Sequence, residues 1–488
     1  MPAPFDSLRD YVAALDAEGL LLRVPELDQD AWEATALVYR ATDRYSMFGV
    51  PALCIERIRS GGSWHRGPVL ALLQSHLDTD ALVVGVPRVP GNPAASYRRA
   101  KARLHELLAQ HRGAYPQLAP LELDAARAPC REVVLRGDEI DLTRFPFLHT
   151  NPGDSGRYLN TGSVFMRDPV LGVNFGTYRC ELKGPRRLGL NCEPGQTGWK
   201  FLQAARARGE QRLQVAIVLG QDPWTWVLSS TRIAPRFNDA PVDELAIAGG
   251  LRGRPLEVVR CPGSDLLVPA HCEMVIEGEV ALQQPGLPEG PFGEMFGYLG
   301  PRKAENFVLE VSAVSHRRDP WFVNAFAGAQ RGMITSPQDA MYEFMLRRAI
   351  PGLVEIYQPQ DAMGIAIMAI RKAAAGDGLR AGRLIAERNP IAKVVIVVDD
   401  DIDVLDRNQV LFAIGSRWQP VPASLTLTDV MGIITDPSQP VQGRTSKIVI
   451  DATRQRADEG GRAEFPATNR ALLEAAAPAA FAQVDERV

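Results

Sequence analysis

The sequence predicts a mixed α/β protein built in three parts, with a β-rich middle between two α/β parts. Helical and strand-like segments alternate at the start, short β-like segments separated by Gly and Pro follow, and αβ alternation returns near residue 336. At 488 residues the chain is also longer than one hydrophobic core usually serves. We therefore expect an N-terminal α/β domain over 1–120, a β-rich domain over 121–330 and a C-terminal α/β domain over 331–488.

The first part begins with a predicted amphipathic helix over residues 7–19. Ser7 suits the N-cap, apolar residues follow at helical spacing, and Gly19 is a typical stop. A strand-like LLLRV comes next, and further helices are expected over about 30–41 and over 97–110. The stretch HRGAYPQLAPLELDAARAPC contains three prolines and little periodicity, so we expect it to be a linker.

The middle part favours a β-barrel or sandwich, because segments such as REVVLR, LQVAIVLG and CEMVIEGEV are separated by turn residues. After it, Ser336 and Pro337 suit the N-cap and first turn of a helix. The runs GIAIMAI and KVVIVV are continuous and apolar, as in strands covered on both faces. The acids of DDDID, from Asp399 to Asp403, could bind a metal at the strand end or simply cap and solvate it, and the second interpretation is favoured.

Composition and motifs exclude several classes of function. The formal net charge is -4, and the chain contains no long block of charged residues of one sign, which argues against a nucleic-acid partner. No apolar stretch is long enough for a membrane span, and acids stand where a signal peptide would be apolar, so we expect a cytoplasmic protein. The six cysteines form no CxxC, and HExxH, GxSxG and GxxxxGK[ST] are absent. Zinc hydrolases, serine hydrolases and nucleoside triphosphatases lose their usual support.

Two glutamates stand out in PEGPFGEMFGY. Glu289 and Glu294 are separated by Gly290, Pro291 and Gly293, which do not fit a helix interior, so both carboxylates are expected on a tight loop. When two carboxyl groups are held close together, one tends to be ionised and the other to have a raised pKa. A general acid near neutral pH needs such a raised pKa. Taken alone, a structural turn is the commoner interpretation.

A second segment, DPVLGVNFGTYRC, presents Asn174 and Arg179 around Gly176. Arginine is suited to bind a carboxylate bidentately, and next to an acid it favours the ionised form of that acid. Asparagine offers a neutral oxygen of the kind that Mg²⁺ or Mn²⁺ accepts. Taken alone, a turn asparagine and a surface arginine remain the commoner interpretation.

The order of these segments is more specific than either segment. NFGTYR, followed further along by DLLVPA, EMVIEGE and EGPFGEM, closely resembles the UbiD family of decarboxylases. The resemblance covers about residues 125–310 at the level of motifs and continues in KVVIVVDDDIDVLDRNQVLFAIGSR and GRTSKIVIDAT. Over residues 1–120 the chain resembles the family only in its general pattern of helical and strand-like segments.

The resemblance implies a lyase with prenylated FMN on a split β-barrel domain, together with a divalent metal, usually Mn²⁺, and K⁺. Such enzymes carry out reversible, non-oxidative decarboxylation of α,β-unsaturated or (hetero)aromatic acids. By motif, Arg179 is expected to orient the substrate carboxylate and bind Glu289, while Glu294 is expected to donate the proton after CO₂ leaves. The cofactor-binding residues that the resemblance implies are Asn174, Phe175, Tyr178, Arg179, Gln196, Ser229, Ser230, Glu244 and Lys393.

The metal site matches the family less completely. Asn174 and Glu244 fall at ligand positions, but the third family ligand is a histidine, and spacing from Arg179 places that position near Thr197. No histidine lies between 150 and 270. Either an all-oxygen set of Asn174, Glu244, the cofactor phosphate and Thr197 or water binds Mg²⁺ or Mn²⁺, or divalent binding is weakened; we favour the first. The K⁺ site is expected at the carbonyls of Leu228, Ser229 and Thr231.

Two alternatives stay open at this stage. One is a flavin oxidoreductase on the same barrel, although nothing in the chain indicates a nicotinamide site. The other is a non-catalytic binding homologue, against which the presence of Arg179, Glu289 and Glu294 together argues. The resemblance also implies a flavin prenyltransferase as supplier of the cofactor and a homodimer formed through the C-terminal domain. Which acid is the substrate does not follow from the sequence.

Overall fold

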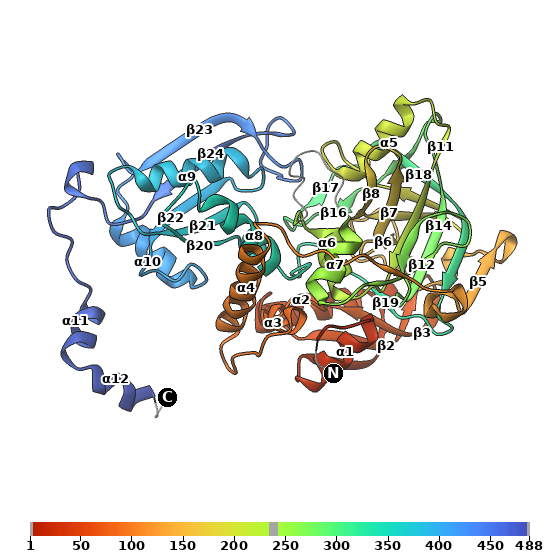
Figure 1. Ribbon diagram of the computed structural model, residues 1–488, viewed down its shortest axis with the longest axis horizontal. Coiled ribbons are helices and arrows are strands. Elements are labelled where there is room, and N and C mark those ends of the chain that lie inside the picture. The colour runs from red at the N-terminus through yellow and green to blue at the C-terminus, as the bar shows by residue number, and fades with distance from the viewer. Residues whose placement is uncertain (1–2, 234–242, 486–488) are drawn as a thin grey trace. The chain divides into compact units, whose positions relative to one another are not determined.

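The structure is a computed structural model and describes residues 3–233 and 243–485. The chain divides into two compact units. The first consists of Met1–Arg348 and Gln360–Ala362, and the second of Ala349–Pro359 and Met363–Val488. Both units combine helices with β-sheet, which confirms the predicted mixed α/β class (Figure 1). The division into three domains stays a prediction.

The N-terminal part of the first unit is a four-stranded sheet with helices. The strands in order are β1 (Leu21–Asp28), β2 (Ala52–Ser60), β3 (Ser63–Ala71) and β19 (Phe322–Val323). The helices are α1 (Leu8–Ala17), α2 (Glu33–Tyr45), α3 (Asp78–Val84) and α4 (Pro93–Gln110). Ser7 caps α1 as predicted, because its hydroxyl accepts a hydrogen bond from the amide of Asp10. In the sequence β19 follows the β-rich segment, so the chain must come back from that segment to complete the four-stranded sheet.

A ten-stranded sheet forms the centre of the first unit, and Figure 1 shows its strands β7, β11, β14 and β18 side by side. Eight strands follow one another in the order β6 (Tyr158–Leu159), β9 (Cys180–Gly184), β10 (Arg187–Leu190), β18 (Lys303–His316), β14 (Met274–Ala281), β11 (Arg212–Leu219), β7 (Ser163–Asp168) and β8 (Gly172–Thr177). The strands β5 (Val133–Arg136) and β15 (Leu287–Glu289) also pair with β18. In the described residues this pairing does not close into a barrel, so the split barrel stays a prediction.

Short helices lie against one end of this sheet. They are α5 (Thr197–Ala207), α6 (Pro223–Ser230) and α7 (Glu244–Arg252), and all three contact β8. The remaining small strands are β4 (Leu121–Glu122), β12 (Glu257–Arg260), β13 (Leu267–Pro269), β16 (Phe292–Gly293) and β17 (Leu299–Gly300). Throughout the described part of the chain, the helices lack the combination of length and apolar content that a membrane crossing requires.

Buried ion pairs tie the N-terminal helices to α8 (Ser336–Leu346). Arg331 donates to the carboxylate of Asp80 at 2.7 Å, and the other oxygen of Asp80 accepts from the amide of Ser336. Lys101 on α4 donates to Glu343 on α8 at 2.8 Å. The helix α8 begins at Ser336, one residue earlier than predicted, with Thr335 at the N-cap. The chain that leaves the central sheet is therefore fixed by charges as well as by apolar packing.

The second unit contains one five-stranded sheet. Its order is β20 (Leu353–Tyr357), β21 (Ile365–Ile370), β22 (Val394–Asp399), β24 (Arg444–Asp451) and β23 (Ser424–Met431). The helices are α9 (Asp377–Arg388), α10 (Arg407–Arg417), α11 (Asn469–Ala476) and α12 (Pro478–Asp485). The runs GIAIMAI and KVVIVV form β21 and β22, which are parallel and largely buried as predicted.

The acidic run after β22 is used in ion pairs. Asp399 accepts from Arg417 at 2.7 Å, and Asp401 accepts from Nη1 and Nη2 of the same guanidinium. Arg454 also contacts the Asp401 carboxylate. These acids therefore fit the structural interpretation rather than a metal site.

Candidate active site

The two glutamates of PEGPFGEM lie on a tight loop, as their glycine and proline neighbours predict. Glu289 is the last residue of β15, Gly290 has a φ of 80°, and Glu294 follows the short strand β16. The loop is fixed from outside, because the amide of Gly293 donates to Asp154 at 2.7 Å and the amide of Gly290 donates to Glu181 at 3.3 Å. Both carboxylates are therefore held on a defined backbone.

Arg179 brings the two carboxylates together. It lies between β8 and β9, and its Nε and Nη2 donate to the two oxygens of Glu289 at 2.8 and 3.0 Å. Its Nη1 donates to Glu294 at 2.5 Å. The side chains of Arg179, Glu289 and Glu294 are 11%, 1% and 17% exposed. The three residues that the sequence singled out thus form one buried ion-pair cluster in which Glu294 is the more accessible acid.

Aromatic residues complete the surroundings of the arginine. The guanidinium lies over the ring of Phe292 at 4.7 Å, a cation–π contact. Tyr158 on β6 packs against the same ring, with 4.5 Å between ring centroids, and its hydroxyl donates to Glu289 Oε1 at 3.1 Å. Burial disfavours the charged form of Arg179, but its hydrogen bonds and the charges of the two glutamates outweigh that effect and raise its pKa. Sequence analysis missed Tyr158, since no motif pointed to β6.

Lys303 is a second residue that sequence analysis missed. It is the first residue of β18 and lies directly opposite Glu289 on β15. Its Nζ donates to Asn191 at 2.6 Å and contacts the Glu193 carboxylate. Burial and the positive charge of Arg179 nevertheless lower the pKa of Lys303 to about 7. Finding Lys303 would have required the register in which β15 and β18 pair, and a single sequence does not specify that register.

Asn174 and Glu244, predicted as metal ligands, lie close together at the end of the sheet. Asn174 is on β8, and the carboxylate of Glu244, at the start of α7, accepts from the amide of the next residue, Phe175, at 3.2 Å. The Nδ2 of Asn174 is buried and has no hydrogen-bond partner. The ring of Phe175 stacks on Phe165 in the core. Tyr178, at the other end of this segment, accepts from the amide of Gly198 at 2.8 Å.

The remaining predicted residues surround this segment. Thr197 is the first residue of α5, and Gln196 precedes it and accepts from the amide of Glu193. At the end of α6, the hydroxyls of Ser229 and Ser230 each lie 3.0 Å from that of Thr177.

Leu228 is buried in the same turn, and Thr231 donates to the carbonyl of Val227 at 2.7 Å. Lys393 lies in the second unit, where it donates to Asp436 and Ser438, so its predicted contact with a phosphate stays a prediction.

The chemistry of these donors fits an anionic cofactor with a hard cation. Hydroxyls, the amide of Asn174 and the carboxylate of Glu244 are oxygen ligands of the kind that Mg²⁺, Mn²⁺ and K⁺ accept. Across the described residues, no three side chains of His, Cys, Asp or Glu come together as a metal cluster. Any divalent ion at Asn174 and Glu244 therefore needs ligands from outside that set, as the missing histidine predicts.

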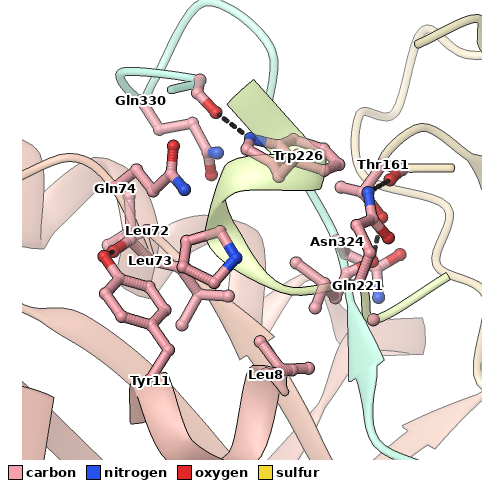
Figure 2. A pocket seen from close by; sticks show the side chains of 14 residues that line it. Leu8, Tyr11, Leu72, Leu73, Gln74, Thr161, Gln221, Trp226, Asn324 and Gln330 are labelled. Carbon is pink, nitrogen blue, oxygen red and sulfur yellow. Dashed lines mark hydrogen bonds between the residues drawn. The ribbon is translucent and has the colours of Figure 1, made fainter. Parts of the chain in front are cut away.

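A cavity of about 40 Å³ lies near this end of the sheet, and the arginine cluster does not line it. Figure 2 shows Gln221 and Asn324 next to Thr161 on one side of it, with Gln74 and Tyr11 on the other. Gln221 Oε1 and Asn324 Nδ2 are buried without a hydrogen-bond partner. Such atoms are ordinarily satisfied by water or a ligand, so this side of the cavity is polar.

A buried arginine that binds two carboxylates, close to oxygen donors suited to an anionic cofactor, is an arrangement typical of enzyme sites that handle acids and protons. Two family models match the chain. One is the 3-octaprenyl-4-hydroxybenzoate carboxy-lyase Rift-related domain over residues 122–330, and the other is the C-terminal domain of that carboxy-lyase over 332–452. The chain therefore belongs to the UbiD family, whose enzymes are decarboxylases, as its motifs predicted.

Known proteins resemble the chain over nearly all of its length. An uncharacterized protein of Aeropyrum pernix is 29% identical over 483 residues, 95% of each chain. The UbiD-class enzyme HmfF of Pelotomaculum thermopropionicum, solved with FMN, has 29% identity and a TM-score of 0.80 over 95% of this chain and 97% of that one. An evolved dimeric form of HmfF, solved with prFMN, has 28% identity and a TM-score of 0.77 over 96% and 98%. Vanillic acid decarboxylase of Sedimentibacter hydroxybenzoicus has 25% identity and a TM-score of 0.79 over 96% of each.

The ion-pair cluster can be tested by removing its cation. Arg179→Met leaves the buried carboxylate of Glu289 uncompensated, and breaking a buried pair in this way typically costs about 3–5 kcal/mol. We expect the urea midpoint of the cofactor-free protein to fall. The double variant Arg179→Met/Glu289→Gln should recover most of the loss.

The matched control is Arg187→Met, which removes the half-exposed pair with Glu310. Because exposed pairs contribute about 0–1 kcal/mol, this variant should unfold nearly as the wild type does. An equal loss of stability in Arg179→Met and in Arg179→Met/Glu289→Gln would contradict a buried ion pair between Arg179 and Glu289.

Proposed function

We propose that the protein catalyses the reversible, non-oxidative decarboxylation of an α,β-unsaturated or (hetero)aromatic carboxylic acid with prenylated FMN. The observation that carries this proposal is the binding of both Glu289 and Glu294 by the single buried Arg179. The likeness to HmfF, solved with FMN and with prFMN, supports a flavin cofactor, and the likeness to vanillic acid decarboxylase supports a small acid as substrate.

Each member of the cluster has a distinct task in this proposal. Arg179 provides the forked donors that bind a carboxylate, so it orients the acid group of the substrate and holds Glu289 in place. Glu294 donates the proton that replaces CO₂, a task that suits the more exposed of the two acids because it must be reloaded from solvent. Prenylated FMN, when bound, supplies the reversible addition to the substrate double bond.

The cofactor is proposed to lie on the ten-stranded sheet, taken as the flavin-binding split barrel. Asn174 and Glu244 would hold Mn²⁺ or Mg²⁺, with Thr197 or water where the family has histidine. The carbonyls of Leu228, Ser229 and Thr231 bind K⁺. The other residues proposed to contact the cofactor are Phe175, Tyr178, Gln196, Ser230 and Lys393. A flavin prenyltransferase supplies the cofactor, and the chain is proposed to act as a cytoplasmic homodimer.

Glu289→Gln tests the assignment of the cluster. Coproduced with a flavin prenyltransferase, the variant should bind prenylated FMN, as seen in its absorption spectrum and by mass spectrometry. It should release no CO₂ from unsaturated acids that the wild type decarboxylates, because a neutral amide does not replace the ionised carboxylate.

The control is Glu310→Gln, which changes an exposed glutamate on β18 and should turn over as the wild type does. Turnover by Glu289→Gln at the wild-type rate would refute the role of Glu289. A wild-type protein that carries ordinary FMN and oxidises NAD(P)H would favour an oxidoreductase, and one that binds the cofactor without turnover of any acid would favour a non-catalytic homologue.

The metal is tested by elemental analysis of the purified, active protein. We expect about one divalent ion per chain, because carboxylate, amide and phosphate oxygens suffice for a hard cation. Glu244→Gln should lower the metal content and the amount of bound cofactor together, while Glu310→Gln should change neither. An active sample without any divalent ion would contradict the all-oxygen site.

A further inference from the structure

A hydrogen-bonded chain leads from the surface to the buried carboxylate of Glu289. The hydroxyl of Tyr158 donates to Glu289 Oε1 at 3.1 Å, and Ser155 Oγ lies 2.8 Å from the same hydroxyl. Ser155 is exposed and lines an open cavity, whereas Tyr158 is fully buried. Because the Tyr158 proton is donated to Glu289, its oxygen is left to accept from Ser155. The chain thus has a defined direction, with each donor pointing toward the carboxylate.

The phenol is held in this position by its neighbours. Its ring packs against Phe292, which also lies under the guanidinium of Arg179. The amide of Ser155 donates to the carbonyl of Pro291 at 2.9 Å, so Ser155 is fastened to the loop that carries both glutamates. Burial, with the charges of Glu289 and Glu181 adding to it, raises the pKa of Tyr158. The hydroxyl therefore stays a donor over the whole working range of pH.

One cation between two carboxylates leaves room for one proton. With both glutamates ionised, the cluster with Arg179 has a formal net charge of −1, and one added proton can reside on either acid. A hydrogen bond donated to a carboxylate favours its ionised form. Among the described residues, Glu289 accepts two such bonds from Arg179 and one from Tyr158, whereas Glu294 accepts a single bond from the cluster, donated by Nη1 of Arg179.

We propose that Tyr158 is a positioning residue that keeps Glu289 ionised and thereby leaves the transferable proton of the cluster on Glu294, with Ser155 setting the direction of the Tyr158 hydroxyl. This inference rests on the proposed function, in which the Glu294 proton replaces CO₂. It goes further by giving the reason why two acids that share one arginine have different tasks. Tyr158 on β6 thereby adds to the asymmetry that the bidentate binding of Glu289 by Arg179 creates.

Other ionisable groups also face Glu289 and are part of its field. They are Arg179, which precedes β9, Cys180 and Glu181 at the start of β9, Glu294 and Asp154 at the loop, and Lys303 opposite on β18. None of them donates a hydrogen bond to Glu289 except Arg179 in the described part of the chain. Tyr158 is a neutral donor. Removing its hydroxyl therefore removes one hydrogen bond to Glu289 and changes the electric field at Glu289 least.

Tyr158→Phe tests the inference, because it retains the ring and removes only the hydroxyl. In the pH profile of kcat of the holoenzyme, the acid limb should move to higher pH by about 0.5–1 pH unit, the equivalent of one ordinary hydrogen bond. The alkaline limb should stay in place, because Glu289 is ionised on both sides of that step. Ser155→Ala should shift the acid limb in the same direction by less, and it remains usable if Tyr158→Phe does not fold.

The matched control is Tyr115→Phe, which removes a buried hydroxyl that donates to the carbonyl of Pro337 at 2.7 Å, away from the site. It should lower thermal stability without moving either limb. An acid limb of Tyr158→Phe at the wild-type pH, or a parallel shift of both limbs, would overturn the inference.

A second readout does not depend on turnover. Infrared difference spectra of the cofactor-free protein over a pH series report protonated carboxyl groups directly. In Tyr158→Phe the protonated-carboxyl band should appear at higher pH than in the wild type, and the added Glu289→Gln change should abolish that difference. An unchanged band would overturn the inference even in an active enzyme. A shifted band in a protein that decarboxylates no acid would instead support Tyr158 while refuting the proposed function.

Discussion

The candidate site depends on one buried arginine that binds two carboxylates. Arg179 is 11% exposed and Glu289 1%, so neither charge could remain buried without the other. The ten-stranded sheet places the arginine between β8 and β9, while β15 and β18 carry the loop with the acids toward it. Strands distant in the sequence therefore meet at this ion pair. The bonds from Gly290 and Gly293 to neighbouring carboxylates fix the loop on its other side.

Much of the fold and the central part of the site could be predicted from the sequence. The apolar runs GIAIMAI and KVVIVV, the cap at Ser7 and the glycines and prolines around Glu289 act locally, and each formed the element that its residues favour. The cluster of Arg179, Glu289 and Glu294 could be predicted only from the order of its motifs, since each segment alone resembles an ordinary turn. The split barrel and the three-domain division remain predictions.

The residues that sequence analysis missed are positioned by strand pairing. Tyr158 lies in the two-residue strand β6, and Lys303 lies opposite Glu289 only because β15 and β18 pair in one particular register. Such register depends on long-range packing and leaves no local pattern. The same applies to Gln221 and Asn324, which share one cavity although a hundred residues separate them in the chain. The missing histidine near Thr197, by contrast, was visible in the sequence, and the described residues provide no substitute cluster of acids, thiols or imidazoles.

In the proposed reaction, the cluster of Arg179, Glu289 and Glu294 delivers one solvent-derived proton to the carbon that loses CO₂. The most direct measurement follows product formation in deuterated water, with protein coproduced with a flavin prenyltransferase and a panel of unsaturated and aromatic acids. For an acid that is turned over, the account predicts one deuterium per CO₂ released, located at the carbon that carried the carboxylate. CO₂ release without deuterium at that carbon, or cofactor-loaded protein that neither decarboxylates nor exchanges any acid, would contradict it.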